Sequence, residues 1–189
     1  AVKALAAADL KEAIPTLITV LGYNNPGAAV AAVDGLILLG EPAVLPLLEQ
    51  LDGYNYGARA WAVRALAGIG DPRGLDILLD ATVNDFALSV RRAAARGLGT
   101  ICWQLMPSAQ IFDAQIRALK TLLQASQDPE WVVRYAAVGG LQALVDAATN
   151  VGSPLLSEVR VRLDEMSDRD ETSAVRARAM LAQQKLSLG

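Results

Sequence analysis

The sequence predicts an all-α fold, a helical-repeat solenoid of about five helix pairs that forms a single domain over residues 1–189. Three observations predict it. A block of about thirty residues recurs along the chain, and apolar residues within each block recur at helical spacing. Hydrophobic residues, many of them alanine, make up 53% of the chain while aromatic residues make up only 5%. Such small side chains suit helices that pack closely in layers.

The repeat is clearest in the first half of the chain. Residues 13–42 read AIPTLITVLGYNNPGAAVAAVDGLILLGEP, and residues 43–72 read AVLPLLEQLDGYNYGARAWAVRALAGIGDP. Each block reads as helix A, a turn and helix B, a unit typical of HEAT-like repeats. The predicted repeats are 12–42, 43–72, 73–107, 108–152 and 153–189. Residues 1–11 have the pattern of a B helix alone, so we expect a partial first repeat there.

Glycine and proline mark the expected element ends. Gly40 and Gly70 each precede an acidic residue and a proline, which predicts that a B helix ends at each glycine. Asn24 and Asn25 precede Pro26–Gly27 and predict a turn before a B helix. The pair Gly139–Gly140 lies inside a helical pattern and predicts a close approach between helices.

Composition excludes several classes of function. The net charge of −3 argues against binding to nucleic acid or to an anionic membrane. Histidine is absent and Cys102 is the only cysteine, so the chain has no imidazole base, no ligand set typical of zinc and no internal disulfide. We therefore expect a cytoplasmic protein with no metal. The longest uncharged stretch, residues 13–33, is interrupted by prolines and asparagines, which argues against a transmembrane segment.

The tyrosine-rich turn and the B-helix patterns carry a resemblance to a known family. The strings are LDGYNYGARAWAVRALAGIGDPRGLDILL, DFALSVRRAAARGLGTI and DPEWVVRYAAVGGL. They resemble the phycobilin lyases of the CpcE/CpcF type, HEAT-like proteins of the PBS-lyase type, and look closest to the F-type (beta) subunit. The resemblance covers about residues 4–144.

The resemblance implies a heterodimer with an E-type subunit that attaches phycocyanobilin, through a thioether, to a cysteine of the phycocyanin alpha subunit. Phycocyanobilin would be a substrate, and no cofactor is expected. A related F-type subunit, of phycoerythrocyanin lyase, also isomerises the bilin with a His-Cys motif; this chain has no histidine, so we expect no isomerase activity. The N-terminal repeat faces are expected to contact the partner.

Two other functions stay open at this point. The chain would serve equally well, by its fold, as a non-catalytic scaffold or degradation adaptor that binds phycobiliproteins. A general protein-interaction solenoid is the reading that remains if the resemblance is coincidental.

Two groups of arginines are expected to differ in role. Of the 17 basic residues, 13 are arginine, and residues 59–134 are the basic part of the chain. Arginines recur at one position of successive B helices and are expected to tie each turn to an acidic residue of the next; they are Arg59, Arg91, Arg134 and Arg176. Arg64, Arg92 and Arg96 do not recur in this way and are candidates for the two propionates of a bilin, or else belong to a solvated face.

Aromatic residues gather at or just after the A-to-B turns, where they would form one edge of the stack. An aromatic edge beside arginines suits a flat, conjugated tetrapyrrole. The predicted bilin-binding residues are Tyr54, Tyr56, Trp61, Arg64, Arg92, Arg96, Trp131 and Tyr135. The alternative for Trp61 and Tyr135 is packing between repeats.

Catalytic residues are not evident. Asp85 is a weak candidate, because its carboxylate would pair with protonated pyrrole nitrogens, but aspartate at this position also begins helices and turns. Cys102 would form a transient adduct with a bilin, or be a buried, inert thiol.

Overall fold

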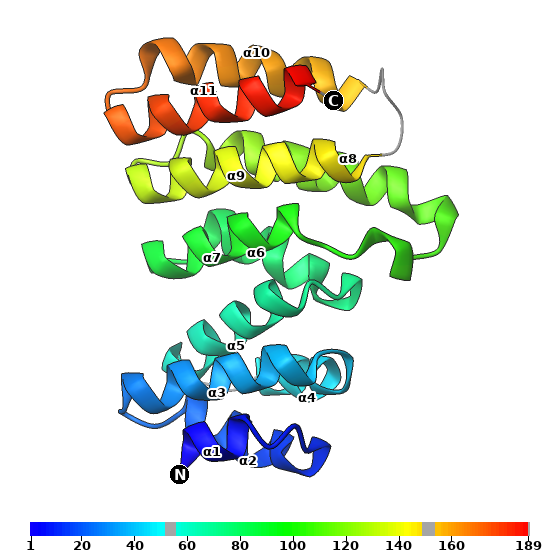
Figure 1. Cartoon of the computed structure of the whole chain (residues 1–189), viewed down its shortest axis with the longest axis vertical. Helices are drawn as coiled ribbons and strands as arrows, with labels where there is room; N and C mark the ends of the chain where they lie inside the picture. Colours follow the sequence, from blue (N-terminus) through cyan, green and yellow to red (C-terminus); the bar gives the residue numbers. More distant parts are fainter. Residues whose placement is uncertain (52–55, 149–153, 189) are drawn as a thin grey trace.

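A computed structural model of the chain describes residues 1–51, 56–148 and 154–188, and confirms the all-α solenoid. The helices stack from the N-terminal end to the C-terminal end in two layers (Figure 1). The A helices are α2 (Ile14–Leu21), α4 (Val44–Gln50), α6 (Leu75–Asn84), α8 (Ser108–Ala125) and α10 (Pro154–Arg169). The B helices are α1 (Val2–Ala6), α3 (Pro26–Leu39), α5 (Tyr56–Ile69), α7 (Leu88–Gly99), α9 (Trp131–Ala147) and α11 (Ser173–Leu188).

Short 3-10 turns precede several A helices. They are η1 (Lys11–Ala13), η2 (Glu41–Ala43), η3 (Pro72–Gly74) and η4 (Trp103–Leu105). The predicted B-helix ends are confirmed, because Gly40 and Gly70 have φ angles of 67° and 72°, a region that favours glycine. The predicted turn before α3 is confirmed as well, since the Asn25 side chain caps that helix by accepting a hydrogen bond from the Ala28 N–H at 3.0 Å.

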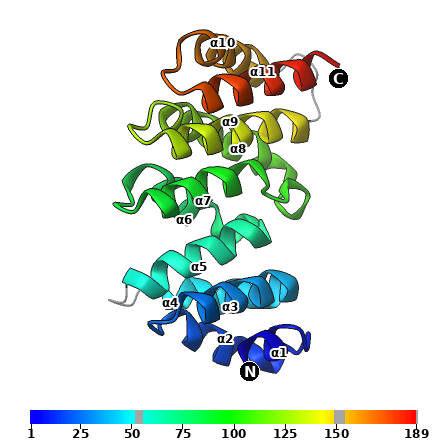
Figure 2. The ribbon, with the colours of Figure 1, turned by 60° about the vertical axis from the view of Figure 1, so that its left-hand side comes forward.

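Each B helix packs closely against the next B helix, and together they form one layer of the stack (Figure 2). A Cβ on Gly140 of α9 would lie 2.5 Å from the Ala95 carbonyl oxygen of α7, and one on Gly99 would lie 2.6 Å from the Gly140 Cα. The close approach predicted from the glycine pair is therefore confirmed at Gly140. The short α1 packs on α3 as a B helix does, with Ala6 against Gly35.

Leucines from both layers fill the space between them. Leu36, Leu66, Leu98 and Leu141 occupy equivalent positions of α3, α5, α7 and α9, and each is almost fully buried. Most of the buried residues form two large clusters, one over the N-terminal repeats and one over the C-terminal repeats, and a small third cluster consists of Ala125, Val133 and Ala137. Helix α5 contributes to both, so it joins the two halves of the core.

An arginine ladder runs along the A-to-B turns, as the sequence predicted. Arg59 Nη1, Arg91 Nε and Arg134 Nε donate to aspartates of the following turn over 2.9, 2.7 and 2.8 Å. The accepting residues are Asp85, Asp128 and Asp170.

Each aspartate of the ladder also shapes its own turn. Its second oxygen accepts a hydrogen bond from the backbone N–H two residues later, at 2.8–2.9 Å, in all three turns. Its backbone carbonyl accepts from the arginine of its own repeat, as Asp128 does from Arg134 Nη1 at 2.9 Å. Arg176 makes this last bond to the Asp170 carbonyl at 2.6 Å but has no ion pair among the described residues, so the predicted pairing is confirmed only for the other three ladder arginines. The ladder therefore holds successive repeats in register.

Candidate functional site

The B helices expose one side, because their other sides contact the A helices and the neighbouring B helices. On α7 and α9 this side carries residues four apart, Arg92 with Arg96 and Trp131 with Tyr135, and all four are exposed. Helix α5 adds Trp61 and Arg64, which are half-buried. We call these six residues the B face. The structure thus places six of the eight predicted bilin-binding residues on one side of three neighbouring helices.

Contacts within the B face link an arginine to an aromatic ring. The Arg64 guanidinium carbon lies 4.5 Å from the centre of the Trp61 ring, a cation–π arrangement. Burial lowers the pKa of Arg64, and the positive charge of Arg92 on the next helix lowers it further. Trp61 also packs against the N-terminal core cluster, as its alternative reading expected, whereas Tyr135 is 42% exposed.

Of the other two predicted aromatic residues, Tyr56 is the first residue of α5. Tyr56 is exposed and meets Phe86 of the next turn edge to face, with ring centres 6.1 Å apart. Phe86, 80% exposed, was not among the predicted site residues, although its position beside Asp85 in an A-to-B turn was a signal for it. Tyr54 lies outside the described residues.

Asp85 has a structural position in the ladder. Its side chain is 6% exposed, pairs with Arg59 and accepts from the Ala87 N–H at 2.9 Å. Asp128 and Asp170 have the same two kinds of partner in their repeats. This geometry accounts for Asp85 without catalysis, and a role for it toward pyrrole nitrogens stays a prediction.

One reading of the arginines needs correction. Arg64 and Arg96 do recur, since each lies five residues after the ladder arginine of its own B helix, Arg59 and Arg91. The following position on α9 is Gly139, and on α3 it is Asp34. The spacing was visible in the sequence, but only the stacked helices show that the two arginines form a row.

Cys102 follows the C-terminal end of α7 and is not part of the B face. It is half-buried, and its N–H donates to the Gly70 carbonyl at 2.8 Å. Among the described residues no group of three or more Cys, Asp or Glu is arranged to hold a metal ion. In the same residues no single helix is long and apolar enough to cross a membrane; α3 passes that test only together with residues 41–50, across a bend of 120°.

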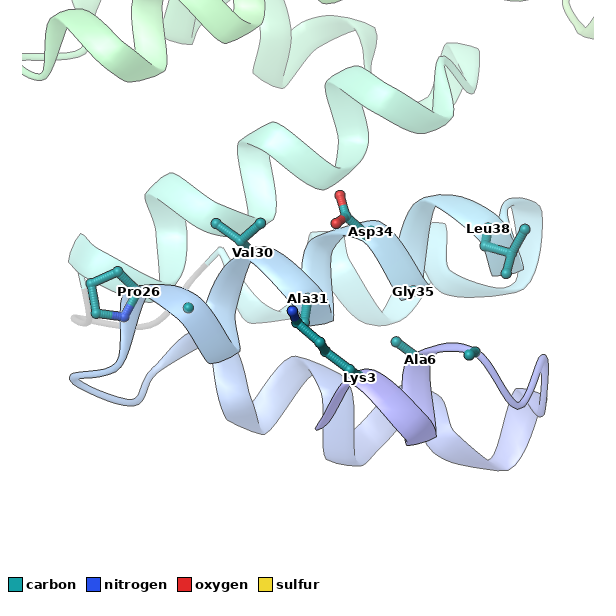
Figure 3. Close-up of a pocket in the computed structure, with 10 residues that line it drawn as sticks. Lys3, Ala6, Pro26, Val30, Ala31, Asp34, Gly35 and Leu38 are labelled. Atoms are coloured by element: carbon teal, nitrogen blue, oxygen red, sulfur yellow. The ribbon is translucent and has the colours of Figure 1, made fainter. Parts of the chain in front are cut away.

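A groove of about 660 Å³ lies between α1 and α3 at the N-terminal end of the stack (Figure 3). Val30 and Leu38 line it from α3 and are 47% and 64% exposed, with Lys3 and Asp34 beside them. The expected contact with a partner at the N-terminal repeat faces stays a prediction. Hydrogen exchange in residues 26–39 tests it, because exchange that does not change on adding the partner would contradict it.

Comparison with known proteins gives a consistent result. A family model for HEAT repeats matches residues 47–142. The chain is 59% identical over 187 residues to phycocyanobilin lyase subunit beta of Pseudanabaena tenuis, and 58% identical over 155 residues to phycocyanin alpha phycocyanobilin lyase CpcF of Synechocystis sp.. These matches cover 98% and 82% of this chain, and 66% and 72% of the relatives. The chain belongs to the CpcF family, the beta subunits of phycocyanobilin lyase.

A solved structure supports the CpcF assignment. The structure of the complex of CpcE and CpcF of phycocyanin lyase from Nostoc sp. matches with a TM-score of 0.82 at 53% identity, over 91% of this chain and 98% of that one. The resemblance read from the tyrosine-rich turn and the B-helix strings is thereby confirmed.

Proposed function

We propose that this chain is the beta-type subunit of a heterodimeric lyase that attaches phycocyanobilin, through a thioether, to a cysteine of the phycocyanin alpha subunit. The observation that carries the proposal is its membership of the CpcF family, together with the solved relative that is complexed with CpcE. The E-type subunit would be the partner of this chain.

The proposed reaction is the addition of a thiol to a carbon–carbon double bond of the bilin. The sulfur of the acceptor cysteine bonds to one carbon, and its proton passes to the conjugated system, so nothing leaves and no oxidant is needed. The subunits then have to hold the bilin extended, exclude wrong conformers and present one carbon to the thiol. This requires neither a cofactor nor a nucleophile on the lyase.

The B face suits the binding part of this task. Exposed rings of Trp131 and Tyr135 offer stacking surface for a conjugated system, and the arginines offer partners for its carboxylates.

We place the protein in the cytoplasm, since its single cysteine leaves it without an internal disulfide.

Reconstitution tests the proposal. Apo-phycocyanin alpha subunit is incubated with phycocyanobilin, this chain and the E-type partner, leaving out each protein in turn, and bilin attachment is read as fluorescence after denaturing electrophoresis. We expect a coloured band, with the absorption of unisomerised phycocyanobilin, only when both chains are present. Colour that does not depend on this chain would contradict the proposal and favour the scaffold or degradation adaptor.

A further inference from the structure

Three arginines of the B face lack the partners that the other helix arginines of their repeats have. Within residues 1–51, 56–148 and 154–188, Arg64, Arg92 and Arg96 make no ion pair and no hydrogen bond to a carboxylate. On the same two helices, Arg59 and Arg91 are paired with Asp85 and Asp128 over 2.9 and 2.7 Å. The absence of partners is therefore a property of the B face and not of the helices.

The unpaired arginines lie on two helices that pack against each other: Arg92 and Arg96 are four residues apart on α7, and Arg64 is on α5. Arg92 on α7 lowers the pKa of Arg64 on α5, after burial, because the two positive charges repel. The Arg64 guanidinium carbon lies 4.5 Å from the centre of the Trp61 ring, and this contact favours one position of the side chain. Like charges held together without a counter-charge are unfavourable for the folded protein unless a bound anion neutralises them.

A fourth arginine, Arg178 on α11, borders the B face. Its Nη1 is buried and has no hydrogen-bond partner among the described residues. Its Nη2 lies 3.4 Å from where a Cβ on Gly139 would be. Arg178 therefore lies over the glycine that takes the place of an arginine in the row of Arg64 and Arg96. A buried guanidinium nitrogen without an acceptor indicates that a ligand or water completes this position.

We infer that Arg64, Arg92 and Arg96 form a dicarboxylate site that holds the two propionates of the bilin, with Arg178 at its C-terminal border. This inference rests on the proposed function. Neighbouring helices pack about 8–10 Å apart, so arginines on α5 and α7 reach carboxylates that hang from adjacent rings of one tetrapyrrole. Arginine donates two parallel hydrogen bonds to a carboxylate, which fixes the direction of each propionate.

The aromatic part of the B face gives this site its orientation. Tyr135 follows Arg92 in the equivalent position of the next B helix, and Trp131 lies one turn before it. With the propionates on α5 and α7, the conjugated rings extend toward α9, where these two exposed side chains offer stacking. A tetrapyrrole with two propionates uses both the arginines and the aromatic rings, whereas the carboxylates of an acidic peptide account only for the arginines.

Binding titrations test the site with two probes, phycocyanobilin and its dimethyl ester, in which both propionates are neutral. The complex of this chain with its E-type partner is compared with one that carries R64Q and R92Q together, following absorbance. The matched control is R117Q, because Arg117 lies on the opposite layer in an exposed pair with Asp76. Thermal unfolding checks the fold of each variant.

We expect R64Q with R92Q to raise the Kd of the free acid at least about tenfold, because the loss of one charge-assisted hydrogen bond weakens binding by about that factor. The ester should bind the unaltered complex weakly, and the double variant no worse. R117Q should bind both probes as the unaltered complex does. The double variant should also unfold at the same or a higher temperature, because a repulsion is removed.

Several results would overturn the inference. One is an unchanged Kd of the free acid in the double variant; another is an ester that binds as tightly as the acid. Saturable binding of an acidic phycocyanin peptide that requires Arg64 and Arg92, with bilin binding unaffected, would assign the site to protein. Failure of the proposed function looks different, since there the unaltered pair attaches no bilin; if it also binds none, both fail.

Discussion

Arginines at two places on the same B helices have opposite surroundings. In the ladder, the side chains of Arg91 and Arg134 are 13% and 9% exposed. Each forms an ion pair with an aspartate that also accepts a backbone hydrogen bond in its own turn. On the B face, Arg92 and Arg96 are exposed and meet none among the described residues. The charge is the same, so the difference lies in where the neighbouring repeat places its carboxylates.

Recurrence at one position of successive helices therefore does not by itself identify a scaffold residue. Hydrogen bonds to Asp170 raise the pKa of Arg134, while burial and a like charge lower that of Arg64. The fold therefore stabilises the charge of Arg134 and disfavours the charge of Arg64.

Loss of a ladder arginine should cost stability and spare binding. Arg134→Gln leaves the Asp170 carboxylate, 6% exposed, without its main partner, and we expect the free energy of unfolding to fall by about 3 kcal/mol. Urea denaturation followed by circular dichroism measures it. In the control, Arg117→Gln removes an exposed pair and should cost less than about 0.5 kcal/mol. Equal losses in the two variants would erase the contrast.

The adjacent glycines Gly139 and Gly140 separate the packed side of α9 from its open side. Gly140→Ala places a Cβ 2.5 Å from the Ala95 carbonyl oxygen, and we expect a loss of about 2 kcal/mol from overpacking. Gly139→Ala meets only the flexible end of Arg178 at 3.4 Å and should be neutral or stabilising, as alanine favours helix. The denaturation midpoints of the two variants test this, and a larger loss at Gly139 would contradict it.

Acid should weaken the ladder in a predictable direction. Burial alone would raise the pKa of Asp170, but hydrogen bonds from Arg134 and the Thr172 N–H outweigh it and hold the pKa below its ordinary value of 3.8. A lowered carboxylate pKa stabilises the fold above the unfolded pKa, and this is lost as the pH falls through the folded value. When the pH is lowered from about 6 to about 3, the unfolding temperature of Asp170→Asn should therefore fall less steeply than that of the unaltered protein. Parallel curves would show that Asp170 is not a source of the acid sensitivity.

Removal of a B-face ring should have the smallest effect and leave stability unchanged. Tyr135→Leu keeps apolar bulk but loses the ring, and we expect the Kd for phycocyanobilin to rise about fivefold, as roughly 1 kcal/mol of stacking is lost. Phe112→Leu is the control, since Phe112 is 54% exposed on α8 of the other layer. A Kd that rises equally in both variants would mean that the B face is not the bilin surface.

Much of this molecule follows from local sequence. The thirty-residue period predicted the repeats. The helix ends at Gly40 and Gly70 and the Asn25 cap depend on contacts within a few residues, so they too were predictable from the sequence. The ladder was also predictable, because a repeat protein places equivalent residues in equivalent contacts. Strings such as WVVRYAAVGGL indicated the family.

Which of these residues share a surface, and which of them have partners, depends on how the repeats pack. The partner of Arg134 is 36 residues away, and the row of Arg64 and Arg96 exists only when α5 and α7 stack. Arg178 was missed because its place over Gly139 depends on the packing of α9 against α11. Periodicity fixes positions within one repeat, whereas charge pairing, burial and exposure depend on atoms that a neighbouring repeat contributes.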